Sequence, residues 1–349
     1  MNCIARLFKQ TYKNGVKQII LGLANKMGLT IERISTRHAD TSFIKRYSIS
    51  MTRPEINYGE LIAKDPLNAT LHLQYAAGAL NKNKAYLSYA ELKTAEYLGA
   101  TRADVGKGMS LARAALPKPE TMNHNGYFRL TSLASELAAR SQEKNFSVLD
   151  VGGGEGMLAS FIPDASYCLV DPSTNGISGI NLPFSDGTFD YVVSCHVLEH
   201  IPAGERNAFL DQLLLKSRRG VILLNPFFIE DTYEKERLQL FIDITDAQWA
   251  KEHLEFDLPK IEDIKSFAKQ RGLTFSAKPN GTLTTGIAIE FMNHFADKAG
   301  LIEDKVRINE FFNVKYEHIL NYPAYPVGYL VYLGRTEANW ATKELLTRG

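Results

Sequence analysis

The sequence predicts an α/β protein whose sheet domain is preceded by a smaller, all-helical region. Residues 58–116 carry many alanines and apolar side chains at helical spacing. An apolar strand at 147–151 runs directly into a glycine-rich turn, and a second apolar strand at 167–170 ends in Asp171. At roughly 150 residues per domain, the 349 residues suffice for about two domains, which fits this division.

Composition places the chain among folded globular proteins, because 45% of its residues are hydrophobic and 23% are charged. The 40 basic and 39 acidic residues leave a net charge of +1, which lacks the basic excess of a nucleic-acid coat, so no nucleic-acid partner is expected. The three cysteines include no Cys-x-x-Cys pair, and no carboxylate cluster stands out. We therefore expect no disulfide framework and a cytoplasmic location; the sequence assigns no metal ligands and leaves open whether a metal assists.

Residues 1–45 are predicted to be a basic amphipathic segment. The first thirty residues carry five basic side chains and no acidic one, and Lys9, Lys13 and Lys17 form one row at four-residue spacing. The lysines interrupt every apolar run, so neither a transmembrane helix nor a signal peptide is expected. Two interpretations stay open: the helix packs on its own protein, or it lies on the inner membrane as a peripheral contact.

The helical region resembles a single tetratricopeptide-type helix pair, with apolar positions recurring over 67–80 and 86–98. A lone repeat cannot bury its apolar face without neighbours, so packing on the sheet domain and binding of a protein partner are both open. Prolines at 117 and 119 disfavour helix and place the boundary there. The predicted segments are 1–45, 46–118, 119–335 and, as a C-terminal tail, 336–349.

The turn at 152–156 is the clearest sign of a ligand site. Its glycines permit positive φ angles and let backbone amides approach a bound molecule closely. Asp171, at the end of the second strand, stands where a carboxylate can accept hydrogen bonds from both hydroxyls of a ribose. The Gly-x-Gly-x-x-Gly dinucleotide fingerprint fails because Met157 replaces its last glycine, which argues against a nicotinamide-dependent oxidoreductase.

The same stretch resembles class I S-adenosylmethionine-dependent methyltransferases, and within them a methyltransferase type 11-like domain. The Asp-x-Gly-x-Gly-x-Gly run at 150–156 resembles their first motif, and Leu-Pro-Phe at 182–184 and His-Val-Leu-Glu-His at 196–200 match later motifs in order. The resemblance covers about residues 120–335. It implies a Rossmann-like sheet of seven strands with helices on both faces and an antiparallel last strand, and S-adenosylmethionine as the cofactor.

The resemblance also implies how the cofactor is held. The methionine moiety lies on the first motif, the ribose on the acidic residue after the second strand, and the adenine edge on the backbone before Leu-Pro-Phe. Many relatives carry an acidic residue where Ser178 stands, so Asn181 is expected to substitute for it. The run His-Asn-Gly-Tyr-Phe-Arg at 124–129 looks like the helix-entry motif of the same family, in which Tyr127 and Arg129 could reach the cofactor carboxylate. An ordinary helix start is an equal alternative. The predicted cofactor residues are Asp150, Gly152, Gly153, Gly154, Gly156, Asp171, Asn181, Leu182, Cys195, Tyr127 and Arg129.

Transfer of a methyl group to a hydroxyl is helped by a base, and histidine is mostly neutral at physiological pH. Three histidines are candidates: His196, His200 and His253. His196 is the first choice because it follows the strand at 191–194 and therefore lies at the cofactor end of the sheet.

A finer similarity suggests the acceptor. The Glu-His and Leu-Pro pairs within 252–259, together with 26–31, look like methyltransferases found among bacterial surface-polysaccharide enzymes. We therefore expect O-methylation of a small molecule, specifically a glycan or glycan intermediate. The alternative is a catalytically inactive, methyltransferase-like binding or scaffold protein that recruits partners through the helical region.

Overall fold

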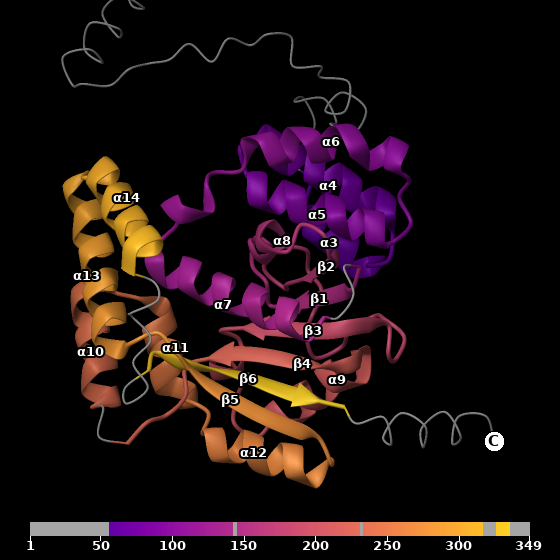
Figure 1. Ribbon diagram of the computed structural model, residues 1–349. Helices are drawn as coiled ribbons and strands as arrows, with labels where there is room; N and C mark the ends of the chain where they lie inside the picture. The colour runs from indigo at the N-terminus through magenta and orange to yellow at the C-terminus, as the bar shows by residue number, and fades with distance from the viewer. Residues whose placement is uncertain (1–55, 142–144, 231–232, 317–325, 336–349) are drawn as a thin grey trace, which may run out of the picture. The chain divides into compact units, whose positions relative to one another are not determined.

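The computed structural model describes residues 56–141, 145–230, 233–316 and 326–335, which all lie in one compact unit, Phe43–Gly349 (Figure 1). The basic segment 1–45, residues 46–55 and the tail 336–349 lie outside the described residues, so the membrane contact stays a prediction. Within the described ranges, no helix is both long enough and apolar enough to cross a bilayer.

Six strands form one mixed sheet in the order β2-β1-β3-β4-β6-β5 (Figure 1). Strands β1 to β4 pair in parallel, whereas β6 runs antiparallel to both β4 and β5, so the antiparallel last strand is as predicted. The carboxyl ends of β1 to β5 therefore meet at one edge. The strands are β1 (Ser147–Val151), β2 (Ser166–Val170), β3 (Phe189–Cys195), β4 (Ser217–Asn225), β5 (Thr274–Asn280) and β6 (Gly328–Gly334).

The prediction of seven strands is corrected to six for the described residues. Between β2 and β3 the chain forms turns instead of a third parallel strand, and helix α5 (Ala85–Tyr97) covers the free edge of β2. Leu169 N donates to Thr94 Oγ1 at 2.9 Å, and Asn175 Nδ2 donates to Leu169 O at 2.9 Å. These side-chain bonds satisfy backbone groups that an additional strand would otherwise pair.

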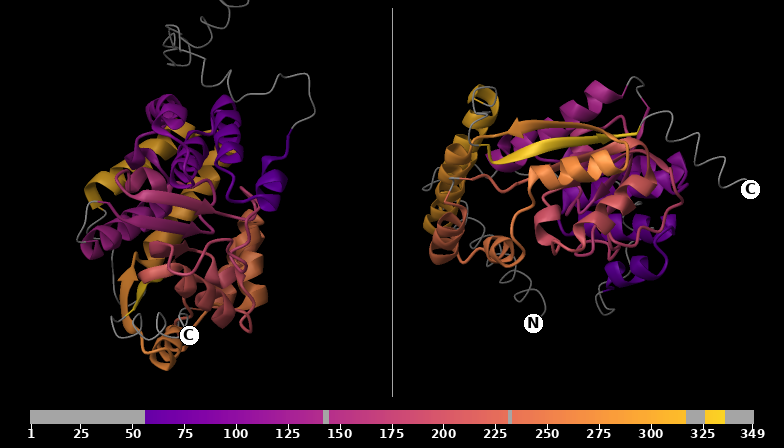
Figure 2. Two further views of the ribbon diagram at one scale, coloured as in Figure 1. Left: turned by 90° about the vertical axis from the view of Figure 1, so that its right-hand side faces the viewer. Right: turned by 90° about the horizontal axis from the view of Figure 1, so that it is seen from below.

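Helices cover both faces of the sheet, as predicted (Figure 2). Alternate strand residues point to opposite faces. Val148 and Ile222 belong to the apolar core on one face, and Leu149 and Leu223 belong to the core on the other. The first core includes α4 (Ala69–Asn81), α5, α6 (Arg102–Ala115), α7 (His124–Arg140) and α8 (Leu158–Phe161); the second includes α3 (Tyr58–Lys64), α9 (Arg206–Lys216) and α12 (Ile261–Gln270).

A further group of helices gathers at one end of the sheet (orange and yellow in Figure 1). Leu238, Phe241 and Ala250 form a small apolar cluster of their own, against which Ile287 and Phe291 pack. The elements here are α10 (Glu234–Thr245), α11 (Gln248–Phe256), α13 (Leu283–Ala299) and α14 (Ile302–Phe311), and the short helical turns of the chain are η1 (Pro119–Thr121), η2 (Leu198–His200) and η3 (Phe312–Tyr316).

Candidate functional site

The turn after β1 has the backbone shape that its glycines predict. Gly152 and Gly154 have φ angles of +75° and +56°, in the left-handed region that side chains disfavour. A Cβ atom on Gly152 would lie 2.2 Å from Val197 Cγ2, whereas one on Gly154 would meet no described atom within 4 Å. Gly154 thus leaves open space beside its backbone, which is the space a cofactor cradle requires.

Asp171, which follows β2, is tied to this turn and to its own loop. Its Oδ2 accepts a hydrogen bond from Gly154 N at 2.9 Å. Its Oδ1 accepts from Ser173 N at 2.9 Å, Ser173 Oγ at 2.6 Å and Thr174 N at 3.0 Å. A carboxylate oxygen offers about two acceptor positions, so Oδ2 keeps one position for a ribose hydroxyl, whereas Oδ1 can accept another only if one of its three donors gives way. The exposed Ser173 hydroxyl is the donor that can rotate away.

Asp150 lies beneath the turn at the end of β1 and is only 2% exposed. It accepts a hydrogen bond from Tyr167 Oη at 2.7 Å. Burial raises its pKa to about 7, the Tyr167 bond opposes that rise, and the charge of Asp171 adds to it. The carboxyl group of Asp150 therefore changes charge near neutrality in the protein without cofactor.

The helical region supports Asp171 through a buried chain of hydrogen bonds. Asp171 N donates to Asn175 Oδ1 at 3.0 Å, and Asn175 Nδ2 donates to Glu91 Oε1 at 3.1 Å. The other carboxylate oxygen of Glu91 lies 2.5 Å from His72 Nδ1, and His72 Nε2 lies 3.0 Å from the carbonyl oxygen of Pro66. Because both ring nitrogens of His72 face acceptors, the ring carries both protons.

A cavity of about 420 Å³ opens at the same edge of the sheet, between the strand ends and helices α7, α10, α11 and α13. Arg129, His196, His200 and His253 line it, so the structure brings the three predicted bases together with one predicted cofactor residue. Aromatic and polar side chains share the rest of the lining, and they include Phe241, Trp249, Asn125, Thr285 and Glu290.

The remaining predicted cofactor residues lie outside this lining. Tyr127 packs edge-on against Phe161, with 5.9 Å between the ring centroids. Asn181 is exposed, and the side chain of Leu182 is buried in the core. Gly153 packs closely on Asp150, because a Cβ atom at Gly153 would lie 2.4 Å from Asp150 Oδ2. Gly156 packs closely on α5, because a Cβ atom there would lie 2.2 Å from Ala90 Cβ.

Cys195 stands between the glycine turn and the cavity. Burial raises the pKa of its thiol to about 12; Arg129 on the cavity side opposes the rise, and Asp150 on the turn side adds to it. The sulfur therefore stays a neutral thiol. Arg129 itself donates from Nε to Asn125 O at 2.9 Å, which fixes its position on α7.

His196 follows β3 with a left-handed φ of +55°. Its Nδ1 lies 3.1 Å from Glu199 Oε1, and its Nε2 has no hydrogen-bond partner in the part of the chain that the structure describes. Burial and the charge of Arg129 lower the pKa of the His196 ring, although Glu199 opposes them. His196 is therefore held as neutral imidazole with one nitrogen available to accept a proton.

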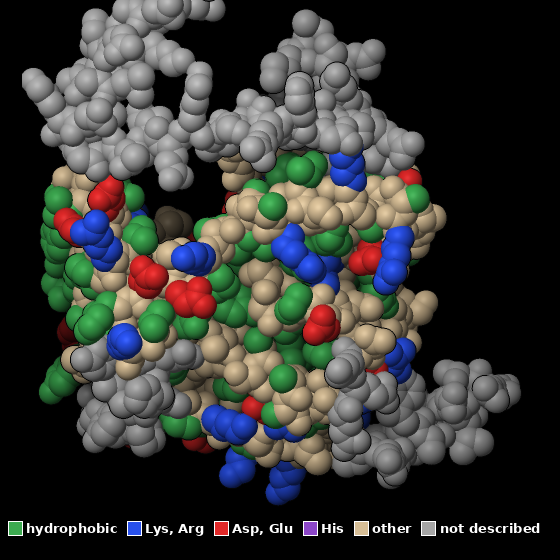
Figure 3. Space-filling model, turned by 45° about the horizontal axis from the view of Figure 1, so that its top comes forward, with side chains coloured by type: hydrophobic (Ala, Val, Ile, Leu, Met, Phe, Trp, Pro, Cys, Tyr) green, Lys and Arg blue, Asp and Glu red, His purple; other side chains and the backbone are tan. Residues whose placement is uncertain are grey.

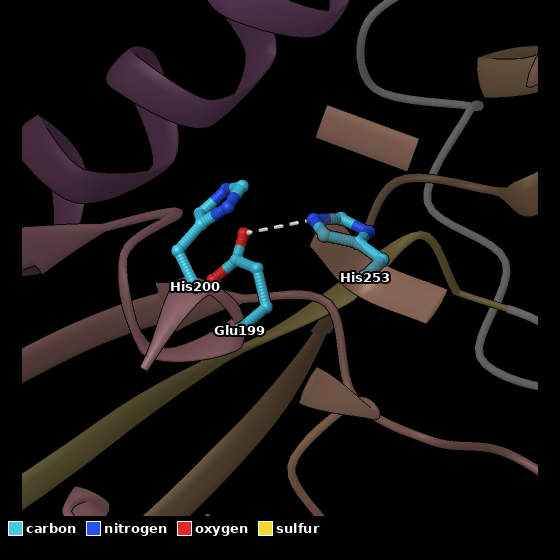
Figure 4. A group of neighbouring side chains, drawn as sticks. All are labelled: Glu199, His200 and His253. Atoms are coloured by element: carbon cyan, nitrogen blue, oxygen red, sulfur yellow. Dashed lines mark ion pairs between the residues drawn. The ribbon is translucent and has the colours of Figure 1, made fainter. Parts of the chain in front are cut away.

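His200 and His253 lie beside Glu199 (Figure 4). His253 Nε2 is 3.9 Å from Glu199 Oε1, and burial lowers the pKa of His253 to about 4. His200 Nδ1 lies 2.6 Å from Glu252 Oε2. Glu199 is fully buried, and its Oε2 accepts from Asn225 Nδ2 at 2.5 Å. Sequence reasoning does not include Glu199 among the site residues, although it lies in the His-Val-Leu-Glu-His motif at 196–200 and its Glu-His pair recurs at 252–253.

Comparison with known proteins identifies the sheet domain. Residues 120–278 match the sequence model of a family described as a methyltransferase domain. No curated protein matches the chain. The chain therefore contains a methyltransferase domain, which confirms the predicted enzyme class, an S-adenosylmethionine-dependent methyltransferase, and its cofactor.

Several solved structures resemble part of this chain at low identity. A protein of Anabaena variabilis, described as a methyltransferase from an antibiotic biosynthesis pathway, is 16% identical with a TM-score of 0.41 over 60% of this chain and 99% of its own. The YcgJ protein of Bacillus subtilis is 16% identical with a TM-score of 0.36 over 58% and 97%. Phosphoethanolamine N-methyltransferase 2 of Haemonchus contortus is 14% identical with a TM-score of 0.37 over 58% and 51%. Similarities this low do not indicate which acceptor the protein methylates.

Proposed function

We propose that this methyltransferase acts on a hydroxyl group of a glycan or glycan intermediate, with His196 as the base. S-adenosylmethionine supplies an electrophilic methyl group, so the protein has to align the acceptor and remove its proton. The observation that carries the proposal is the free Nε2 of His196 in the wall of the cavity. Nε2 accepts the hydroxyl proton, and Glu199 Oε1, 3.1 Å from Nδ1, stabilises the imidazolium that forms.

The cavity lining suits a sugar. A sugar ring presents apolar C–H faces and polar hydroxyl edges, so it fits a wall that is partly aromatic and partly polar. Trp249 packs against Phe241 with ring centroids 5.2 Å apart and contributes the aromatic part. Asn125 donates to Glu290 Oε1 at 2.7 Å, so these two side chains form a fixed polar pair in the same lining.

Arg237 adds a preference for an acidic acceptor. It lines the cavity, and its Nη1 is buried without a hydrogen-bond partner among the residues described. A buried guanidinium with a free N–H group favours a carboxylate or phosphate, which it can bind through charge-assisted hydrogen bonds. We therefore expect uronic acids, sugar phosphates or nucleotide sugars to be better acceptors than neutral sugars.

The test is methyl transfer from S-adenosylmethionine to a panel of these sugars by the full chain and by His196→Asn. Asparagine tolerates the left-handed backbone of this position, so the variant removes the base with little added strain. General bases contribute about 10²–10⁴-fold, so kcat falls by about that factor while cofactor affinity is unchanged. His294→Asn, on α13 outside the cavity lining, is the matched control and keeps full activity.

Other outcomes contradict the proposal. Equal kcat in the unaltered chain and His196→Asn would remove His196 as the base. Methylation of amines or thiols without methylation of any hydroxyl would remove the acceptor class. Saturable cofactor binding with no methyl transfer to any acceptor would favour the alternative, a catalytically inactive binding or scaffold protein.

A further inference from the structure

We propose that Glu199, His200 and His253 bind a divalent transition-metal ion, with Zn²⁺ as the best match. Each residue offers one ligand atom, and these atoms all lie within 4.8 Å of one another. Glu199 and His200 come from η2 at the sheet edge, and His253 comes from α11, so the fold brings the group together across the cavity wall. Figure 4 shows the Glu199 carboxylate directed toward His253, with the His200 ring beside it.

Two of the three side chains are buried and can each offer a ligand atom. Glu199 and His253 are 0% and 6% exposed; His253 Nε2 has no hydrogen-bond partner in the described part of the chain, and Glu199 Oε1 contacts His196 Nδ1 at 3.1 Å, which leaves its second lone pair for an ion. Such buried polar atoms cost about 1–3 kcal/mol each when they stay unsatisfied. Arrangements of this kind are therefore retained where a ligand satisfies them.

The spacing of these two atoms fits one ion. Their 3.9 Å separation is too long for a hydrogen bond. Two ligand atoms of a tetrahedral ion with bonds of about 2.1 Å stand about 3.4 Å apart, so Glu199 Oε1 and His253 Nε2 need to approach by about 0.5 Å to hold one ion. His200, which is part-buried, offers a third ligand atom within 4.8 Å of the other two.

Further side chains orient the ligands. Asn225 Nδ2 holds Glu199 Oε2, which leaves Oε1 for the ion. Glu252 Oε2 lies 2.6 Å from His200 Nδ1, which leaves His200 Nε2 as the donor nitrogen. A carboxylate behind a metal-bound histidine is the usual means of fixing its tautomer and ring orientation.

Two imidazoles and one carboxylate are the donor set of catalytic zinc sites that keep a position open, and imidazole ligands favour Zn²⁺ over Mg²⁺ or Ca²⁺. His200 and His253 line the cavity, so the open position faces the acceptor. An ion there would bind the acceptor oxygen and lower the pKa of its hydroxyl group. This role rests on the proposed function, whereas metal binding itself does not.

The test is calorimetric titration of chelator-treated, full-length protein with Zn²⁺ alone. We expect one ion per chain, with affinity lost in Glu199→Gln and His253→Gln. Glu252→Gln, which alters only the orienting carboxylate, is expected to weaken binding by about 10–100-fold. The matched controls are Glu255→Gln, exposed on the same helix α11, and His294→Gln on α13; both keep the affinity of the unaltered chain.

A second measurement needs no substitution at the site. Titration of the unaltered chain with Co²⁺ gives visible absorption bands when the ion enters a nitrogen-oxygen site of low symmetry, and Zn²⁺ abolishes them by competition. Absence of stoichiometric binding, or equal binding by all the variants, would overturn the metal site. Because both readouts are binding, they stay distinct from the proposed function, which fails when the metal-loaded protein methylates no hydroxyl.

Discussion

The glycine turn and the histidine cavity share one edge of the sheet but differ in how their polar groups are bonded. Around the turn, Asp171 accepts four hydrogen bonds from the protein and Asp150 is bonded to Tyr167. Around the cavity, the buried Nε2 atoms of His196 and His253 lack partners among the residues the structure describes. The turn is thus completed by the protein itself, whereas the cavity is completed by what it binds.

This difference assigns separate tasks to the two regions. A fully bonded network holds its shape before the ligand arrives, so the cofactor side is preorganised. The cavity side keeps unsatisfied atoms, which the proposed metal and acceptor would satisfy. On the face drawn in Figure 3, acidic and basic side chains of the described residues are interspersed.

The largest expected effect is the loss of cofactor affinity when Asp171, on the preorganised side, is replaced. Asp171→Ala removes the ribose acceptor and unties both the glycine turn and the 173–174 loop. Two hydrogen bonds to a charged group contribute about 1.5–3 kcal/mol each, so affinity for S-adenosylmethionine falls by about 3–6 kcal/mol, or two to four powers of ten. Calorimetric titration with S-adenosylmethionine and S-adenosylhomocysteine measures this loss.

Ser173→Ala is the matched control for that experiment. It removes only the hydroxyl that competes with ribose for Asp171 Oδ1 and keeps the backbone donor at 2.9 Å. Cofactor affinity therefore stays equal or rises slightly. If Asp171→Ala bound the cofactor as tightly as Ser173→Ala, the ribose assignment would be wrong.

A second prediction compares two glycines within the turn. Gly152→Ala adds strain of about 1–2 kcal/mol for its positive φ and about 1–3 kcal/mol for the close approach to Val197. Gly154→Ala has only the first cost, because its Cβ would meet no atom of the described chain within 4 Å. Urea unfolding should show the larger loss of stability in Gly152→Ala. Cofactor titration should rank the two variants the other way. Gly154→Ala should lose more affinity for the cofactor, because its new methyl group occupies the ligand space.

Much of the preorganised side could be predicted from the sequence, because its signals are local. The strand, the glycine turn and the acidic residue after the next strand are contiguous patterns, and each follows from backbone sterics or alternation of apolar residues. The helix pair now seen as α4 and α5 has the same kind of signal, since its apolar spacing is visible in one stretch of the chain.

The rest depends on contacts between distant segments. The sequence predicts a seventh strand, but the side chains of Thr94 and Asn175 bond the backbone of Leu169 at the free edge of β2 instead. The proposed metal ligands stand 53 positions apart, at 200 and 253, and no spacing rule joins them. The partnership of His72 with Glu91 is likewise visible only once α4 and α5 are packed.

The pairing of His72 with Glu91 allows a test of how far the hydrogen-bond network around Asp171 extends into the helical region. Burial alone would lower the pKa of His72, but the charge and hydrogen bond of Glu91 and the carbonyl of Pro66 raise it, with a net pKa above the ordinary 6.5. The folded protein therefore holds this proton more tightly than the unfolded chain does. The stabilisation is fully present below about pH 6.5 and is lost as the pH rises through the raised pKa, by about 1.4 kcal/mol per unit of the shift.

The smallest predicted effect is a reversal of this pH dependence in Glu91→Gln. Without the carboxylate, burial keeps His72 neutral, so folding resists protonation and stability falls as the pH drops below about 6.5. Glu255→Gln, exposed on α11, keeps the pH dependence of the unaltered chain. Urea unfolding between about pH 6 and about pH 8 measures the free energy of unfolding of all three proteins. Parallel curves for the unaltered chain and Glu91→Gln would show that His72 holds no proton and that the bonded network ends at Asn175.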